Sequence, residues 1–161
     1  FILLFVIGIF YISLTRDTNY NTSSLINKET PEFKIISFDE SSLYTRDDIK
    51  KNNFTLINFW ASWCAPCKIE HPILMKLSQT KNLMIIGVNF KDKEIQAKTF
   101  LNNLGNPYDL LAKDENGKQS VKFGIYGIPE SILINKDLMI IQKFVGPLSI
   151  DDYDNIIKIM E

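Results

Sequence analysis

The two cysteines of this chain, Cys64 and Cys67, lie at the junction of two sequence patterns. An apolar strand-like run covers residues 54–60, and a helical pattern begins at Ala65. Two cysteines separated by two residues at such a junction are typical of a redox site. The chain has no other cysteine, so no second disulfide can crosslink the fold. An inert disulfide is the alternative, but a bond that closes so short a loop would stabilise a fold little.

From residue 32 onward, strand-like and helix-like segments alternate. Strands are predicted at residues 33–38, 54–60, 83–90, 108–112, 131–135 and 139–145, and helices after Thr45, at 65–79, 93–104 and 118–123, and from the Ser149 cap to Met160. The continuous apolar run LMIIGV, residues 83–88, predicts a central strand buried on both faces. The order of segments predicts an α/β fold with a mixed central sheet flanked by helices, in which parallel crossovers come first and an antiparallel hairpin comes last.

The chain divides by composition into three parts. Residues 1–15 contain the charge-free run FILLFVIGIFYISL, which we interpret as a transmembrane helix. As a helix this run would reach only about 21 Å against a hydrocarbon core of about 30 Å, a length that also suits a signal-peptide core or a buried helix. The sequence starts at Phe rather than Met, which leaves room for further residues upstream of this run. Because no small-residue cleavage site follows the run, we favour an uncleaved membrane anchor. Residues 16–31 are predicted to be a polar linker, and residues 32–161 a single globular domain.

The charge of the chain argues against nucleic acid as a partner. The formal net charge is -1 and no long basic run occurs, whereas nucleic-acid binding depends on clustered Lys and Arg. We therefore expect no nucleic acid to bind.

The motifs of the chain point to a known fold and family. The pattern Trp-Cys-x-Pro-Cys after a strand, Pro72 in the following helix and Ile128-Pro129 before a strand resemble thioredoxin. The membrane segment and four longer motifs more narrowly resemble the CcmG/DsbE family of cytochrome c maturation: WASWCAPCKIEHP at 60–72, GVNFKD at 87–92, GIYGIPES at 124–131 and VGPL at 145–148. Phe90 and Ser131 depart mildly from the Tyr and Thr that the family often has. The resemblance implies a thioredoxin-like fold.

Each cysteine has a predicted role. Cys64 stands at the start of a helix, where unpaired N–H groups and the helix dipole stabilise a thiolate, so we assign it the nucleophilic attack on a substrate disulfide. Cys67, almost one turn further into the helix, is predicted to be the resolving thiol. Glu70 shares a helix face with Cys67 and is predicted to tune the thiol pKa values and to accept a proton. The resemblance implies a functional glutamate there, and a solvated helix acid is the alternative.

The predicted substrate-binding residues come from both sides of the cysteines. They are Trp63, Pro66, Tyr126, Ile128, Pro129 and Glu130. The resemblance implies that Pro129 is cis and faces the cysteines, so that the backbone of Ile128 binds an extended substrate segment. Trp63 is expected to be exposed and Trp60 to pack in the core. The Glu130 carboxylate either faces the active-site groove or is an ordinary acid at a strand start.

A metal site is a different interpretation of the same residues. Cys64, Cys67 and His71 could bind copper, and the protein would then be a metallochaperone. No further Cys or His exists to complete a tetrahedral zinc site, and His71 is more simply a partly exposed helix residue. We therefore expect no metal and no cofactor besides a redox-active Cys64–Cys67 disulfide.

The resemblance implies a protein-disulfide reductase of the bacterial inner membrane, with one membrane span and its catalytic domain in the periplasm. Its expected substrate is apocytochrome c or a partner thiol protein of the same pathway. A dithiol in an oxidising compartment stays reduced only when electrons are supplied, so a membrane thiol electron donor is the second expected partner. The alternatives are a general disulfide reductase of the same fold, the copper metallochaperone, and a non-catalytic module that holds apocytochrome.

Overall fold

The computed structural model describes residues 2–15 and 25–161 of the chain. Helix α1, Ile2–Thr15, occupies the predicted membrane segment. In the described ranges, no helix has both the length and the apolar character needed to cross a membrane. Residues 16–24 of the predicted linker lie outside the described residues.

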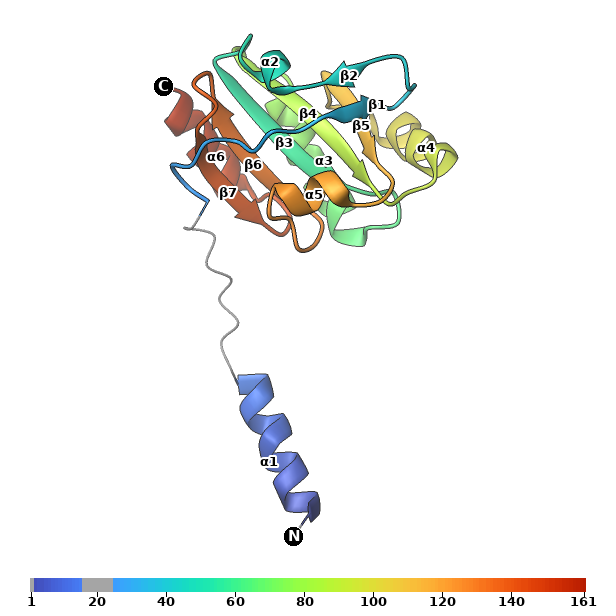
Figure 1. Ribbon diagram of the computed structural model, residues 1–161, viewed down its shortest axis with the longest axis vertical. Helices are drawn as coiled ribbons and strands as arrows, with labels where there is room; N and C mark the ends of the chain where they lie inside the picture. The colour runs from blue at the N-terminus through green and yellow to red at the C-terminus, as the bar shows by residue number, and fades with distance from the viewer. Residues whose placement is uncertain (1, 16–24) are drawn as a thin grey trace.

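A mixed sheet of seven strands forms the centre of the domain, in the order β2-β1-β5-β4-β3-β6-β7 (Figure 1). The strands are β1 Ile35–Ser37, β2 Leu43–Tyr44, β3 Phe54–Trp60, β4 Leu83–Phe90, β5 Leu110–Asp114, β6 Glu130–Asn135 and β7 Ile140–Val145. β4 is parallel to β3 and to β5, and the other pairs are antiparallel. The predicted order of parallel crossovers before an antiparallel hairpin is therefore confirmed.

Helices cover both faces of this sheet (Figure 1). They are α2 Arg46–Ile49, α3 Ala65–Leu77, α4 Glu94–Leu104, α5 Lys118–Lys122 and α6 Ile150–Met160. Successive side chains of a strand point to opposite faces, so β3 contributes to two cores. Its Leu56 and Trp60 pack with α3, α4 and α6, whereas Ile57 and Phe59 pack on the other face with residues such as Ile49 of α2.

The observed elements include one strand that was not predicted, and several others begin or end one or two residues from their predicted bounds. Strand β2 was not predicted, because two residues are too few to show an alternating pattern. Strand β5 begins at Leu110 rather than at Tyr108. Just before β5, the Asp109 side chain rather than a backbone carbonyl accepts the N–H of Ile85, at 2.7 Å.

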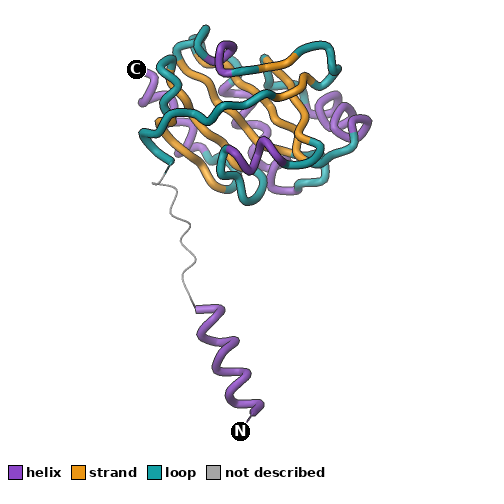
Figure 2. Tube along the Cα trace, in the orientation of Figure 1, coloured by secondary structure: helices purple, strands orange, loops and turns teal. Residues whose placement is uncertain are grey.

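The end of the predicted linker belongs to the domain. Residues 25–31, which we call the N-terminal arm, run beside the β6–β7 hairpin (Figure 2). The N–H of Asn27 donates to the Ile140 carbonyl at 2.8 Å, and the N–H of Thr30 donates to the Leu138 carbonyl at 2.7 Å. The N–H of Ile140 donates in return to the Lys28 carbonyl at 2.9 Å. The predicted domain start at residue 32 is therefore too late, because a polar segment can join a sheet edge through its backbone alone.

Candidate active site

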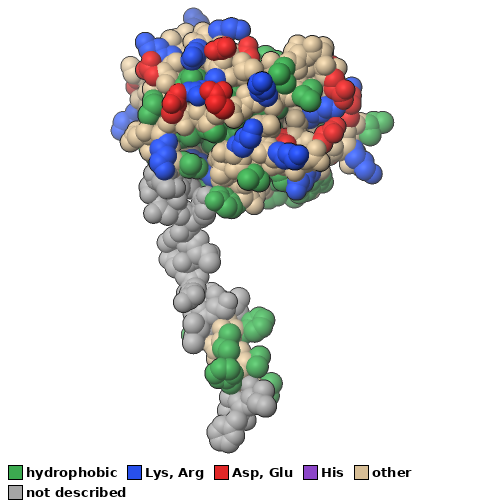
Figure 3. Space-filling model, viewed as in Figure 1, with side chains coloured by type: hydrophobic (Ala, Val, Ile, Leu, Met, Phe, Trp, Pro, Cys, Tyr) green, Lys and Arg blue, Asp and Glu red, His purple; other side chains and the backbone are tan. Residues whose placement is uncertain are grey.

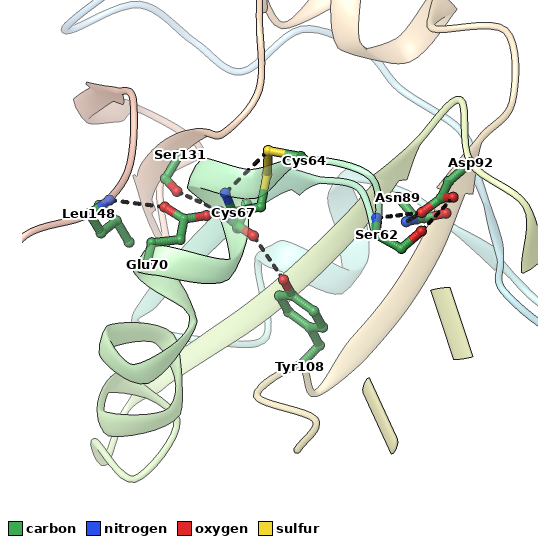
Figure 4. The surroundings of a disulfide bond; sticks show 10 residues. Ser62, Cys64, Cys67, Glu70, Asn89, Asp92, Tyr108, Ser131 and Leu148 are labelled. Atoms are coloured by element: carbon green, nitrogen blue, oxygen red, sulfur yellow. Dashed lines mark hydrogen bonds between the residues drawn. A yellow bond between two sulfur atoms is a disulfide. The ribbon is translucent and has the colours of Figure 1, made fainter. Parts of the chain in front are cut away.

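The two cysteines lie at the N-terminus of α3 and form a disulfide (Figure 4). Cys64 is the N-cap residue of the helix, and its Sγ accepts the N–H of Cys67 at 3.2 Å. Cys64 is 5% exposed and Cys67 is 2% exposed. A helix N-terminus stabilises a negative charge, so the local geometry favours a thiolate at Cys64 once the disulfide is reduced. This placement fits the predicted roles of nucleophile and resolving thiol.

Glu70 is fully buried, so the alternative of a solvated helix acid is wrong. Its Oε1 accepts an N–H of the Asn58 amide at 2.8 Å, and its Oε2 accepts the N–H of Leu148 at 2.9 Å. Burial raises the pKa of the Glu70 carboxyl to about 7, and the two hydrogen bonds oppose that shift only in part. A carboxyl with this pKa can take up or release a proton near neutral pH.

Asn58 connects Glu70 to two further side chains. Its amide also donates to Ser131 Oγ at 3.0 Å, and its Oδ1 accepts the hydroxyl of Tyr108 at 2.9 Å. The network of Asn58, Glu70, Tyr108 and Ser131 thus joins β3, α3, β6 and the segment before β5. Sequence reasoning missed Asn58 and Tyr108. The available signal was a polar Asn between the apolar residues Ile57 and Phe59 in the middle of the strand.

A second part of the candidate site begins at the Ile128–Pro129 peptide. This peptide is cis, as the resemblance implies. In the sheet register, Asn58 faces Ser131 and Phe59 faces Glu130. Pro129 therefore lies beside the end of β3 from which the cysteine turn continues. That Pro129 faces the cysteines remains a prediction from the resemblance.

The carboxylate of Glu130 is enclosed, which corrects both expectations for this residue. Its Oε1 accepts the N–H groups of Tyr126 and Gly127 at 3.1 and 3.0 Å, and the Nζ of Lys143 lies 2.7 Å from its Oε2. Lys143 also donates to the Gly124 carbonyl at 2.6 Å. Glu130 and Lys143 are therefore buried beneath the loop of residues 124–127, which precedes the cis peptide, and bind its backbone. Lys143 was not predicted as a buried residue, since a single Lys in a strand is usually exposed.

Two cavities lie between Trp63 and α4, one of them lined by Cys64, and we call them together the Trp63 groove. The first has a volume of about 300 Å³ and is lined by Ser62, Trp63, Cys64, Ala65, Lys68, Phe100, Asn103 and Leu104. The second has a volume of about 450 Å³ and shares Ser62, Trp63, Phe100 and Asn103 with the first. Cys64 thus borders a space large enough for side chains of a substrate.

The predicted substrate-binding residues divide between two sides. Trp63 is 57% exposed and lines the groove, while Trp60 is buried, as expected. Tyr126 is exposed but does not line the Trp63 groove, and neither do Ile128 and Pro129. Pro66 is an exposed residue in the first turn of α3.

His71 is buried, so the expectation of a partly exposed residue is wrong. Its Nε2 lies 3.1 Å from the Gly105 carbonyl oxygen, and burial lowers the pKa of the imidazole. In the parts of the chain that the structure describes, no three His, Cys, Asp or Glu side chains gather to hold a metal ion. The structure therefore does not assemble Cys64, Cys67 and His71 into the copper site considered above.

Comparisons with known proteins agree with this geometry. The family model described as Redoxin matches residues 26–157. The thiol:disulfide interchange protein HelX of Rhodobacter capsulatus is 36% identical over 146 residues, which cover 90% of this chain and 82% of HelX. The thiol:disulfide interchange protein DsbE of Pseudomonas aeruginosa is 36% identical over 152 residues, which cover 90% of this chain and 84% of that protein.

Solved structures show the same fold. A crystal structure of a putative thiol:disulfide interchange protein DsbE from Chlorobium tepidum superposes with a TM-score of 0.70 at 25% identity, over 84% of this chain and 95% of that one. The thioredoxin domain of a thiol-disulfide oxidoreductase from Bacteroides vulgatus superposes with a TM-score of 0.71 at 22% identity, over 84% and 98% of the two chains. The thioredoxin-like fold is therefore confirmed.

Proposed function

Because the chain belongs to the Redoxin family and to its thiol:disulfide interchange proteins of the DsbE/CcmG type, we propose that it is a reductant of cytochrome c maturation. Disulfide oxidoreductase activity follows from the family, the fold and the Cys64–Cys67 pair. The substrate in this proposal is the disulfide of apocytochrome c or of a partner thiol protein. The observation that carries it is the match along more than four fifths of HelX and DsbE, because a general reductase would need to share only the fold.

The reaction starts from the reduced dithiol. The Cys64 thiolate attacks one sulfur of the substrate disulfide, that S–S bond breaks, and the other substrate sulfur leaves as a thiolate. The Cys67 thiolate then attacks Cys64 Sγ in the mixed disulfide and displaces the second substrate thiolate. Two electrons pass to the substrate, and the oxidised Cys64–Cys67 pair remains, with no cofactor required. Glu70, one turn beyond Cys67 on α3, accepts the proton that Cys67 gives up (Figure 4).

The working site in this proposal is the periplasmic face of a bacterial inner membrane. Helix α1 would contribute to a single membrane anchor. Figure 3 shows hydrophobic side chains on the surface of α1, which supports this role. The exposed ones are Leu3, Phe5, Val6, Ile7, Ile9, Phe10 and Tyr11. An oxidised active site must be reduced again before the next turnover, so a membrane protein with its own dithiol is the required electron donor.

The experiment that tests the proposal is covalent trapping in cells. The Cys67→Ser variant cannot resolve the mixed disulfide and should accumulate Cys64 bonded to its substrates, which are then identified by mass spectrometry. The Cys64→Ser, Cys67→Ser double variant is the control for non-covalent contaminants. Recovery of apocytochrome c or of a thiol protein of its pathway supports the proposal.

Other outcomes of the trapping experiment contradict specific parts of the proposal. A set of trapped proteins with no member of cytochrome c maturation would indicate a general disulfide reductase. Trapping by Cys64→Ser in place of Cys67→Ser would reverse the roles assigned to the two thiols.

A further inference from the structure

The carboxylate of Asp92 lies beside the turn that leads to Cys64, and it accepts four hydrogen bonds. Figure 4 shows those from Ser62 and Asn89. The backbone N–H and the hydroxyl of Ser62 donate to it at 2.6 and 2.8 Å. The Asn89 amide donates at 3.0 Å, and the N–H of Lys93 donates at 2.8 Å. Hydrogen bonds to a charged acceptor are stronger than neutral ones, so this carboxylate fixes Ser62 against the loop after β4.

The next residue, Trp63, is bound to the same loop. Its indole Nε1 donates to the Lys91 carbonyl at 3.2 Å. The N–H of Lys91 in turn donates to the Asp114 carbonyl at 3.2 Å, which anchors the loop to the end of β5. Ser62 and Trp63, the two residues that precede Cys64, are therefore both tied to residues 91 and 92.

Trp63 needs such an attachment because more than half of its surface is exposed. Trp63 is 57% exposed, so less than half of its surface is covered by packing. It nevertheless lines both cavities of the Trp63 groove, together with Ser62, Phe100 and Asn103. The shape of this groove next to Cys64 thus depends on hydrogen bonds that hold the turn.

We propose that Asp92 is a positioning residue that fixes Trp63 as a wall of the substrate groove beside Cys64. The proposal builds on the disulfide exchange described above, and it adds that a substrate polypeptide chain lies against Trp63 and α4. It gives a physical role to the end of the GVNFKD motif, whose Asn89 and Asp92 otherwise have no place in the reaction. Asp92 acts on substrate affinity through Trp63 and does not touch the reacting sulfurs.

The test is a single-turnover measurement with the reduced full-length protein. The substrates are an oxidised peptide that contains Cys-x-x-Cys-His, the sequence of a haem-attachment site, and insulin as a general protein disulfide. The small reagent 5,5′-dithiobis(2-nitrobenzoate) reports on the Cys64 thiolate without occupying the groove. Asp92→Ala should raise the half-saturating concentration of both polypeptides about tenfold, a size expected for lost hydrogen bonds to a charged group. The saturating rate and the rate with the small reagent should stay within about twofold.

A double-mutant cycle separates positioning from a general loss of structure. Trp63→Ala alone should raise the half-saturating concentration at least as much as Asp92→Ala, and adding Asp92→Ala to it should change the value less than about twofold. Asp39→Ala is the matched control. The Asp39 carboxylate also accepts the N–H and the hydroxyl of a serine, Ser41, but it lines neither cavity. This control should leave the half-saturating concentrations unchanged.

Three results would overturn the role of Asp92. They are an unchanged half-saturating concentration in Asp92→Ala, an equal loss with the small reagent, and effects that multiply in the double variant. A wild-type protein that reduces insulin as readily as the peptide would contradict the proposed substrate but not this inference. The inference is decided by the change that Asp92→Ala causes with either polypeptide.

Discussion

Glu70 holds its proton in a place that water does not reach. Its side chain is fully buried, and burial raises its pKa to about 7 even though Asn58 and Leu148 both donate hydrogen bonds to the charged form. Both donors point at the carboxylate, so the site accommodates the ionised form as well as the protonated one. At the scale of single residues, this balance supports the proposed role of Glu70 as the proton acceptor for Cys67 near neutral pH.

The raised pKa of Glu70 predicts how the stability of the protein depends on pH. Because the pKa in the folded protein is above its ordinary value of 4.5, the protonated carboxyl stabilises the fold below pH 4.5, and that contribution is lost as the pH rises through about 7. The difference amounts to about 3 kcal/mol. Between pH 4.5 and 8, the free energy of unfolding of the oxidised wild type should fall by about this amount relative to Glu70→Gln. Urea denaturation of both proteins across this range measures it, and a constant difference would contradict the prediction.

At the scale of elements, β4 supports the buried network through a glycine. A Cβ placed on Gly87 would lie 2.6 Å from Cγ of the Tyr108 ring. The ring therefore lies directly on the strand backbone, and Trp60 stacks with it at a centroid distance of 5.5 Å. In this position the Tyr108 hydroxyl reaches Asn58. The first residue of the GVNFKD motif thus acts on the network behind Cys67, while Asp92, its last residue, acts on the turn before Cys64.

Gly87→Ala should displace the Tyr108 ring and destabilise the protein by about 1–3 kcal/mol, the usual effect of overpacking a filled core. Gly127→Ala is the matched control, because no heavy atom lies within 4 Å of a Cβ built there. The control should change the free energy of unfolding by less than about 0.5 kcal/mol. Denaturation midpoints in urea compare the two variants. Similar losses in both would show that the contact with Tyr108 does not explain the glycine.

At the scale of the whole molecule, the N-terminal arm packs against the β6–β7 hairpin and the loop that begins at Gly124. Its backbone pairs with the β6–β7 hairpin, and Thr30 is buried with its hydroxyl donating to the Leu138 carbonyl at 2.8 Å. At the start of the arm, Leu25 Cδ1 lies 3.0 Å from the position of a Cβ on Gly124. Gly124 begins the loop that Lys143 and Glu130 hold. The segment before the domain therefore joins it beside the loop that carries Tyr126.

A protein that begins at residue 25 should be as stable as the full chain, whereas one that begins at residue 32 should lose roughly 2–4 kcal/mol. The loss reflects several backbone hydrogen bonds of about 1 kcal/mol each and a newly exposed strand edge. Thr30→Val in the full chain isolates one of these bonds and should cost about 1 kcal/mol. Urea denaturation measures all three proteins. Equal stability of the two shortened proteins would mean that the arm is not part of the fold.

The sequence by itself determined the place of the cysteine pair and the order of the strands and helices, except for the two-residue strand β2. Both depend on local patterns: alternation of apolar residues within a segment, and two thiols at the first turn of a helix. The cis Ile128–Pro129 peptide was implied by the family resemblance of a motif. The helical spacing of Glu70 and Cys67 likewise predicted that the two side chains share a helix face. Spacing alone does not show whether that face is buried.

Only the tertiary structure decided which partners these residues meet. Asn58 contacts Ser131, Ser62 contacts Asp92, and Thr30 contacts Leu138, across separations of 73, 30 and 108 residues. The pairing of the N-terminal arm uses backbone groups that every sequence has, so composition could not reveal it. Whether a carboxyl such as Glu70 or Glu130 is buried depends on donors brought from other strands and loops. Long-range packing, which no local pattern encodes, therefore set the chemistry around the two sulfurs.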